Sequence, residues 1–186
     1  AHIDDADSAC DDLGVFAGRT VEIFPAWEGE PAEEAVDEIG AERLRLVLEL
    51  SQRQSATPMT ATSIQALMQP VPEPQCLNKS ALAIRAGSSI EPERVAAWLA
   101  DHSFEPVDSV DMPGQFARRG GIIDVYAPVA LLGASNEDLT EHEPASVSRP
   151  VRIEFFGDQV ESIRRIDLDT QRSAEPLESL SILPPI

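Results

Sequence analysis

Cysteine, histidine, lysine and aromatic residues are scarce in this chain of 186 residues. It contains two cysteines, three histidines and one lysine, and aromatic residues account for 5% of its length. Cys10 and Cys76 lie far apart without the spacing of a zinc site, so we expect two reduced thiols in a cytoplasmic protein. No apolar run approaches the roughly 20 residues that span a bilayer, and the first residues predict no signal segment. We therefore expect neither a disulfide scaffold nor a membrane protein.

The motifs of nucleotide binding and of nucleophilic catalysis are also missing. The single lysine, Lys79, is not surrounded by the glycines that a phosphate loop requires. No G-x-S-x-G elbow is present, and none of the histidines falls in a catalytic pattern: His2, His102 and His142. The acidic run 4-DDAD-7 lacks the glycine turn and closing Glu of a calcium loop, which favours a solvated acidic face. We expect no catalytic site, no cofactor and no metal ion in this chain.

Basic residues are few, and their distribution is uneven. The 14 basic residues stand against 33 acidic ones, and the formal net charge is −19. Such a balance argues strongly against direct binding to nucleic acid. Residues 1–50 hold 14 Asp and Glu, whereas half of all basic residues lie between Arg118 and Arg172. The arginines are therefore the unusual feature of that second segment.

The first 75 residues predict alternating helices and strands. Residues 4–16 are rich in acidic side chains and fit either a helix ending at Gly14 or a loose N-terminal segment. The remaining elements are expected as a strand at 20–24, a helix at 41–50, a strand at 59–61 and a helix at 63–68 with Ser63 as its N-cap. Strands and helices in alternation favour a parallel α/β arrangement.

Residues 69–75, QPVPEPQ, contain three prolines, which cannot continue a helix and predict a linker or domain boundary. Beyond them we expect a strand at 81–84 and a helix from Ile90 with Pro92 in its first turn. Two strands, at 104–112 and 115–117, should follow around a turn at Pro113–Gly114. A mobile loop is expected at 127–149, interrupted only by the apolar residues 129–132, and a last strand at 177–183. The chain then consists of an α/β segment, 1–75, and an α+β domain, 76–186, dominated by antiparallel hairpins.

The stretch from Pro113 to Ser173 carries the strongest local signals. Ile122–Tyr126 predicts a short buried strand that follows a Gly-Gly pair. Val151–Phe155 alternates apolar and polar residues as a half-buried strand does, and a second alternating run begins at Val160. Phe156-Gly157-Asp158 supplies turn residues between the two runs, so we expect a hairpin with Gly-Asp at its tip.

Side chains alternate along a strand with a period of two residues, so the first strand of this hairpin has two faces. If Val151, Ile153 and Phe155 pack on the core, Arg152 and Phe156 emerge together on the outer face. Arg119, at the entry to the neighbouring strand, can join them there. An exposed aromatic residue beside arginines is typical of protein interfaces. The alternative is that Phe156 belongs to the core or to the hairpin tip, and that the arginines pair only with nearby acids: Glu154, Asp158 and Glu161.

Three runs of residues carry a resemblance to a known family: 118-RRGGIIDVY-126, 152-RIEFFGDQVESIRRID-167 and 169-DTQRS-173. They resemble the second domain of the excision-repair protein UvrB. They resemble more closely the UvrB-homologous N-terminal module of the transcription-repair coupling factors (Mfd), which the last run and the upstream Phe24-Pro-Ala-Trp27 favour. The resemblance runs over most of the chain, and its most specific part is 113–173.

The resemblance implies that this domain binds UvrA, the damage-sensing subunit of excision repair, and that Arg119, Arg152 and Phe156 match the recognition residues. It also implies that 1–75 is part of a degenerate RecA-like domain without its phosphate loop, and that 76–186 is a UvrB domain 2-like, UvrA-binding domain. Two features depart from the family pattern. Arg118 creates a double arginine, so either arginine could face outward, and the long loop at 127–149 could reshape or shield the surface.

We predict a non-catalytic adaptor, a fragment of a coupling factor that recruits UvrA to sites where RNA polymerase has stalled on DNA. Its parent would be an ATP-dependent DNA translocase, and the absence of an initial Met agrees with an excised piece. Two alternatives remain at this point. One is the corresponding part of a UvrB-like helicase, and the other is an acidic interaction domain that binds an unrelated basic partner through residues 1–50.

Overall fold

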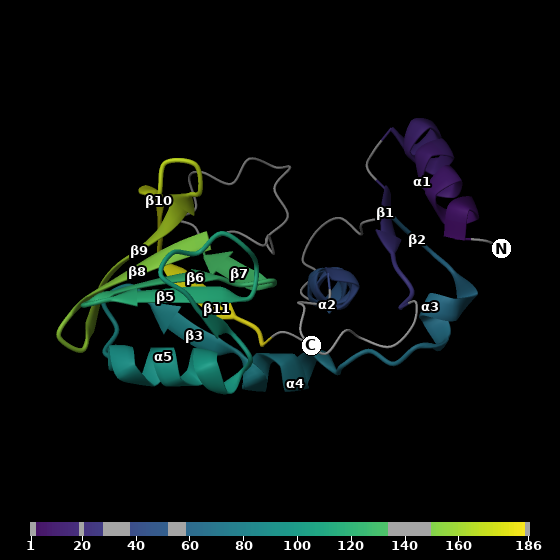
Figure 1. Cartoon of the computed structure of the whole chain (residues 1–186). Helices are drawn as coiled ribbons and strands as arrows, with labels where there is room; N and C mark the ends of the chain where they lie inside the picture. Colours follow the sequence, from purple (N-terminus) through teal and green to yellow (C-terminus); the bar gives the residue numbers. More distant parts are fainter. Residues whose placement is uncertain (1–2, 19–20, 28–37, 52–58, 134–149, 185–186) are drawn as a thin grey trace. The chain divides into compact units, whose positions relative to one another are not determined.

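The computed structural model describes residues 3–18, 21–27, 38–51, 59–133 and 150–184. The chain divides into two compact units, an N-terminal unit, Ala1–Cys76, and a C-terminal unit, Leu77–Ile186 (Figure 1). This division lies next to the boundary predicted from the prolines. The architecture is mixed α/β with antiparallel sheets. None of the helices within the described ranges is long and apolar enough to cross a membrane.

Before Pro74, the described residues of the N-terminal unit form two strands and three helices: α1 (Ile3–Ala17), β1 (Val21–Phe24), α2 (Glu38–Ser51), β2 (Met59–Thr62) and α3 (Ile64–Met68). The strands β1 and β2 pair in parallel, as their alternation with helices predicts. A small apolar cluster joins Phe24 of β1 to Leu46 of α2 and Ala66 of α3. The hydroxyl of Ser63 accepts a hydrogen bond from the Ala66 amide at 3.1 Å, which confirms the predicted N-cap.

Two boundaries in this part of the chain differ from the predicted ones. Helix α1 continues past Gly14 to Ala17, and Gly18 ends it with a φ of +63°, where a residue without Cβ is favoured. The last predicted linker residues belong to a helix, α4 (Pro74–Ser80), which contains the boundary between the units. Pro74 begins this helix, where a missing backbone N–H leaves no helical hydrogen bond unmade.

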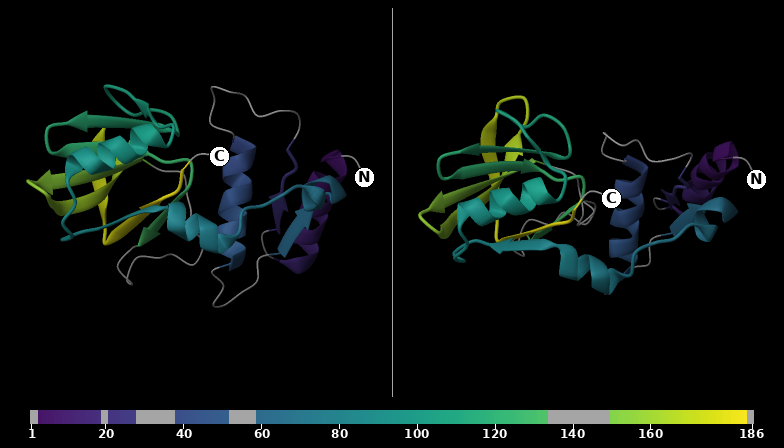
Figure 2. Two further views of the ribbon diagram at one scale, coloured as in Figure 1. Left: turned by 90° about the horizontal axis from the view of Figure 1, so that it is seen from below. Right: turned by 60° about the horizontal axis from the view of Figure 1, so that its bottom comes forward.

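The C-terminal unit contains one more helix and nine strands within its described residues: β3 (Leu82–Arg85), α5 (Pro92–Asp101), β4 (Glu105–Pro106), β5 (Gln115–Arg119), β6 (Ile122–Tyr126), β7 (Ala130–Gly133), β8 (Pro150–Phe156), β9 (Gln159–Asp167), β10 (Arg172–Leu177) and β11 (Ser179–Ile182). Six strands form one sheet in the order β10-β9-β8-β6-β5-β4, and three form a second sheet in the order β3-β11-β7. Helix α5 lies along the sheets (Figure 2).

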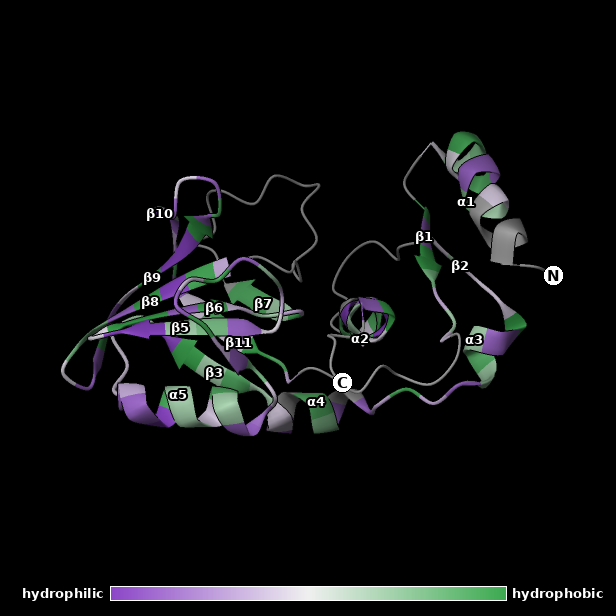
Figure 3. Cartoon of the chain, in the orientation of Figure 1, coloured by the Kyte–Doolittle hydropathy of each residue, from purple (hydrophilic) through white to green (hydrophobic). Residues whose placement is uncertain are grey.

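One face of the six-stranded sheet, called the inner face below, packs into the main core. It contributes Ile123, Val125 and Ile153, which join Val95 and Leu99 of α5 in one buried cluster. The opposite face is called the outer face. Hydrophobic residues colour much of β3 and β7 in Figure 3, whereas hydrophilic residues colour much of β5 and β9. The predicted burial of Val151, Ile153 and Phe155 is confirmed, since all three are buried on β8.

Three predictions for the C-terminal unit were wrong or incomplete. The strand expected at 104–112 is reduced to β4, which pairs with β5 in parallel. The Val107 amide still donates to the Phe116 carbonyl at 2.9 Å, and the residues after it leave the sheet edge and cross to the outer face. Part of the predicted loop at 127–149 is the strand β7, which pairs with β11, and residues 134–149 lie outside the described residues. Residues 172–176, which were not expected to form a strand, belong with Leu177 to β10, which pairs with β9.

Candidate interaction surface

A buried carboxylate, Asp124, lies at the centre of the outer face. On β6 it alternates with Ile123 and Val125 of the core, so its side chain projects to the opposite side of the sheet. It is nevertheless almost fully buried. A carboxylate in such a position requires charged or hydrogen-bonding partners.

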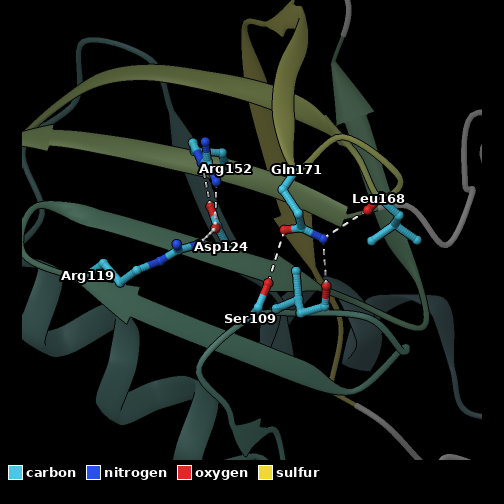
Figure 4. A network of polar contacts seen from close by, with 7 residues as sticks. Ser109, Arg119, Asp124, Arg152, Leu168 and Gln171 are labelled. Carbon is cyan, nitrogen blue, oxygen red and sulfur yellow. Dashed lines mark hydrogen bonds and ion pairs between the residues drawn. The ribbon is translucent and has the colours of Figure 1, made fainter.

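Two arginines provide these partners (Figure 4). The strand register places Arg152 of β8 directly opposite Asp124, and its Nε and Nη2 atoms donate to the two carboxylate oxygens at 2.7 and 2.8 Å. Arg119 of β5 donates from Nη2 to Oδ2 at 2.9 Å. We call Arg119, Asp124 and Arg152 the arginine cluster. Its hydrogen bonds to Asp124 raise the pKa of Arg152 above its ordinary value, despite the opposing effect of burial.

The two arginines of the cluster differ in exposure. The Arg119 side chain is 55% exposed and uses one nitrogen on Asp124, so its remaining donors face solvent. The Arg152 side chain is 15% exposed and is held by two hydrogen bonds to the same carboxylate. Arg119 is therefore the more accessible donor, and Arg152 is the more firmly oriented one.

The structure also separates the two neighbouring arginines on β5. Arg118 lies opposite Ile123 of the inner face and forms an ion pair with Glu93 of α5. The pKa of Glu93 is lowered, first by a backbone hydrogen bond at its own amide and then by Arg118. Arg119 lies on the other face, where it reaches Asp124. The alternation of a single strand thus assigns Arg119, and not Arg118, to the outer face.

Phe156 stands at the tip of the β8–β9 hairpin and is 80% exposed. The predicted Gly-Asp tip is confirmed: Gly157 has a φ of +60°, as the first central residue of a type II′ turn does. The tip is held from a second direction, because the Ile90 amide donates to the Asp158 carbonyl at 2.8 Å. An aromatic side chain thus projects into solvent from a braced hairpin.

Gly121 allows the close contact between β6 and the end of β8. A Cβ atom at this position would lie 2.8 Å from the carbonyl oxygen of Phe155, which is closer than a carbon can approach. The Phe155 amide donates to the Gly121 carbonyl at 2.7 Å. The absence of a side chain at Gly121 therefore sets the position of the strand immediately before Phe156.

A register shift in β8–β9 adds a third arginine to the outer face. The shift lies between Glu154 and Phe155, and beyond it Arg164 of β9 stands directly opposite Arg152. Side chains that face each other across an antiparallel pair lie on the same side, so the exposed Arg164 belongs to the outer face. We missed this residue in the sequence, because counting back from the two-residue turn without a shift places Ile163 opposite Arg152.

Two other titratable side chains of the described residues have local partners. Glu154 accepts a hydrogen bond from the Ser162 hydroxyl at 2.5 Å, and His102 stacks on Trp98 with ring centroids 4.0 Å apart. Within the described ranges, no three His, Cys, Asp or Glu side chains gather as a metal site would require. The features that stand out on the outer face are therefore exposed arginines and one aromatic side chain.

Comparison with known proteins relates the chain to one family. A family model described as the UvrB interaction domain matches residues 82–131 and 134–185. The chain is 33% identical to the transcription-repair-coupling factor of Bacillus subtilis over 182 residues, which are 96% of the chain and 14% of that protein. It is 32% identical to the transcription-repair-coupling factor of Mycobacterium bovis over 179 residues, 92% of the chain and 13% of that protein. The corresponding protein of Escherichia coli is 25% identical over 176 residues, 94% of the chain and 14% of that protein.

Proposed function

Because the chain belongs to the UvrB interaction domain family, we propose that it is the UvrA-binding adaptor of a transcription-repair coupling factor. The observation that carries the proposal is the outer face of the C-terminal unit, where the arginine cluster and the exposed Phe156 come from strands that the family model covers. In this role the chain is not catalytic. By binding UvrA, the chain brings the excision machinery to the larger protein of which the chain is a part.

The proposal extends to a parent protein, since the chain spans 14% of the length of the Bacillus subtilis relative. In the parent, an ATP-dependent translocase on DNA displaces a stalled RNA polymerase, and this chain then recruits UvrA. With its net charge of −19, the chain itself makes no direct contact with DNA in this scheme. Contact with DNA and with RNA polymerase belongs to other parts of the parent.

We assign the two units to different ancestral domains. The parallel pairing of β1 with β2 and the helices between and after them support a partial, degenerate RecA-like segment over residues 1–75. The antiparallel sheets of the remaining residues, 76–186, support a domain like the second domain of UvrB. The UvrA-binding function resides in this second domain.

The outer face offers UvrA three kinds of contact. Phe156 supplies a large apolar area with few rotamers, and its tip is already held in place, so little entropy is lost on binding. Arg119 keeps donors that can bind a carboxylate on the partner. Arg152 holds Asp124, and 15% of its side chain remains exposed.

Arg164 is a further contact residue in this proposal. It faces Arg152 across the β8–β9 pair, where two like charges destabilise a sheet unless something offsets them. Asp124 offsets the charge of Arg152 but already binds two arginines. An acidic group on UvrA that approaches Arg164 would relieve the repulsion. The proposed partner surface is therefore acidic opposite the arginines and apolar opposite Phe156.

The test is isothermal calorimetry of the full chain with purified UvrA. We expect Phe156→Ala to weaken binding by about 2 kcal/mol, roughly thirtyfold, and the double variant Arg152→Ala/Phe156→Ala to abolish measurable binding. The matched controls are Phe16→Ala, an exposed phenylalanine of α1, and Arg94→Ala, an exposed arginine of α5. If the double variant folds and binds as tightly as the wild type, the outer face is not the UvrA site.

A further inference from the structure

The segment between β4 and β5, residues 107–113, lies on the outer face beside the arginine cluster. Its Val107 and Val110 pack against three residues of the sheet: Ala117, Tyr126 and Ile166. Ala117 of β5 is the direct cross-strand neighbour of Asp124. The apolar contact between the segment and the sheet is therefore adjacent to the buried carboxylate. We call residues 107–113 the crossing loop.

Two glutamines hold the crossing loop in one conformation. The buried Gln115 accepts hydrogen bonds from the amides of Asp111 and Met112 at 3.1 and 3.2 Å. Gln171, in the turn between β9 and β10, accepts from the Ser109 hydroxyl at 3.1 Å (Figure 4). Hydrogen bonds thus hold the loop at two places, Gln115 on β5 and Gln171 in the turn that follows β9.

Gln171 makes these contacts from an unusual backbone conformation. Its φ is +55°, in the left-handed region that residues other than glycine rarely adopt. Its Nε2 atom also donates to the Leu168 carbonyl at 3.1 Å and lies 3.5 Å from the Val110 carbonyl. A non-glycine residue persists in this region where its surroundings hold it there, and such residues often mark functional sites.

Met112 is the exposed apolar side chain of the crossing loop, at 58% exposure. It lies near the end of the sheet opposite to Phe156, since its amide binds Gln115 and Gln115 pairs with Tyr126. Tyr126 in turn pairs with Pro150, six residues before Phe156 on β8. At the rise of an extended strand, the two exposed apolar side chains are about 20 Å apart along the strand direction, with the arginine cluster between them.

We propose that the crossing loop is part of the same interface, with Met112 as a contact residue and Gln171 as a positioning residue. The inference rests on the proposed binding of UvrA. A stable interface covers about 800 Å² on each partner, more than the four side chains Arg119, Arg152, Phe156 and Arg164 provide, and flexible methionines are common in such surfaces. The complementary surface on UvrA is then acidic at its centre and apolar at two points about 20 Å apart.

The contact role is tested by calorimetry of the full chain with UvrA. We expect Met112→Ala to weaken binding about fivefold, and Met112→Leu to retain the wild-type affinity within about twofold. The matched control is Met68→Ala, a methionine of α3 that is 82% exposed and lies in the other unit. An unchanged affinity of Met112→Ala, measured beside a weakened Phe156→Ala, would overturn the inference and leave the proposed function standing. A wild-type chain that does not bind UvrA would overturn both.

The positioning role of Gln171 requires a different measurement. We expect Gln171→Ala to weaken UvrA binding about threefold and to speed hydrogen exchange at the amides of Asp111 and Met112, whose loop it no longer holds. Because Gln171 acts through the loop, the substitution should weaken binding no further in the Met112→Ala background. Additive losses in the double variant, or unchanged exchange at the two amides, would show that Gln171 does not position Met112.

Discussion

Arginine serves opposite purposes in the two units. In the N-terminal unit, Arg43 of α2 is buried and donates to the carbonyls of Pro25 and Pro70 at 2.6 and 3.3 Å. Its guanidinium also lies 4.4 Å from the ring centre of Phe24 and 4.5 Å from that of Trp27. In the C-terminal unit, Arg119 and Arg152 converge on one carboxylate at the surface of a sheet.

The difference comes from the backbone that surrounds each guanidinium. Pro25, which follows β1, and Pro70, which follows α3, have carbonyl oxygens outside any strand or helix, so the Arg43 guanidinium can donate to both. In the sheet, neighbouring strands already use their carbonyls, and a buried carboxylate is the acceptor that remains. Arg43 therefore stabilises the fold of the N-terminal unit, whereas the arginine cluster leaves positive charge available on the outer face of the sheet.

The two units also differ in the sheets that their described residues form. The C-terminal unit has a continuous buried cluster drawn from two sheets and α5. Among the described residues of the N-terminal unit, two strands pair, Phe24, Leu46 and Ala66 form a cluster, and Leu44 and Leu48 are buried as well. A two-stranded sheet is marginal by itself, so the side chains packed around β1 and β2 contribute to keeping these strands paired.

The largest effect should follow from Arg43→Ala. Removal of the guanidinium leaves the Pro25 and Pro70 carbonyls without this donor and opens a gap between two rings, so the N-terminal unit should lose about 3 kcal/mol of stability. UvrA affinity should stay within about twofold of the wild type, because the outer face lies in the other unit. Hydrogen exchange along β1 and α2 measures the first effect, and calorimetry measures the second. If Arg43→Ala lost UvrA binding while its C-terminal unit remained folded, the separation of roles between the two units would be contradicted.

Gly121→Ala should have the next largest effect, now in the C-terminal unit. The added Cβ would meet the Phe155 carbonyl at 2.8 Å, and the strands must separate to relieve it. We expect a loss of about 2 kcal/mol in urea unfolding, with weaker UvrA binding because the end of β8 carries Phe156. Gly87→Ala is a useful comparison, since it has the strain of a positive φ but nothing within 4 Å of the added Cβ. Equal UvrA affinities in wild type and Gly121→Ala would show that the spacing of β6 and β8 does not govern the site.

Asp124→Asn isolates the charge at the centre of the outer face. The amide keeps the shape of the carboxylate but turns a donor toward one of the two arginines, so we expect a loss of about 1.5 kcal/mol of stability. Binding of UvrA should weaken as well, because the two guanidiniums lose their common anchor. Glu154→Gln separates charge from hydrogen bonding, as Glu154 accepts from Ser162 and acts on Arg152 only through its charge. If Asp124→Asn were as stable as the wild type, the arginines of the cluster would need no fixed acceptor.

The smallest effect concerns pH and the turn after β9. The amide and hydroxyl of Thr170 donate to Asp167 and lower its pKa below the ordinary value of 3.8. A carboxyl whose pKa is lowered by folding stabilises the protein above its unfolded pKa, and that contribution is lost as the pH falls through the folded pKa. Asp167→Asn should therefore unfold with a slightly shallower dependence on pH below 3.8. Parallel acid-unfolding curves of the two proteins would contradict this assignment.

Much of the fold could be predicted because local patterns decide it. The alternation of Val151, Ile153 and Phe155 indicates which face of β8 is buried, and Gly157 marks the tip of its hairpin. The N-cap at Ser63 and the parallel pairing of β1 and β2 follow from equally local signals. The exposure of Phe156 follows from the same alternation.

The failures share a different cause. The crossing loop contains apolar residues that suit a strand, but they pack on the outer face instead of extending β4. The strand β7 forms because β11 lies beside it, and its own sequence is too short to predict it. Arg164 reaches the outer face through a register shift that no local signal marks.

The sequence by itself thus determined most of the elements, the buried face of β8 and the types of residue available for an interface. These properties depend on the periodicity of side chains along one segment and on residues with restricted backbone angles. Only the tertiary structure decided that Arg119 and not Arg118 joins Asp124, that Arg164 faces Arg152, and that the crossing loop lies beside them. Those outcomes depend on which strands become neighbours and in what register, and this is settled by packing across the whole sheet.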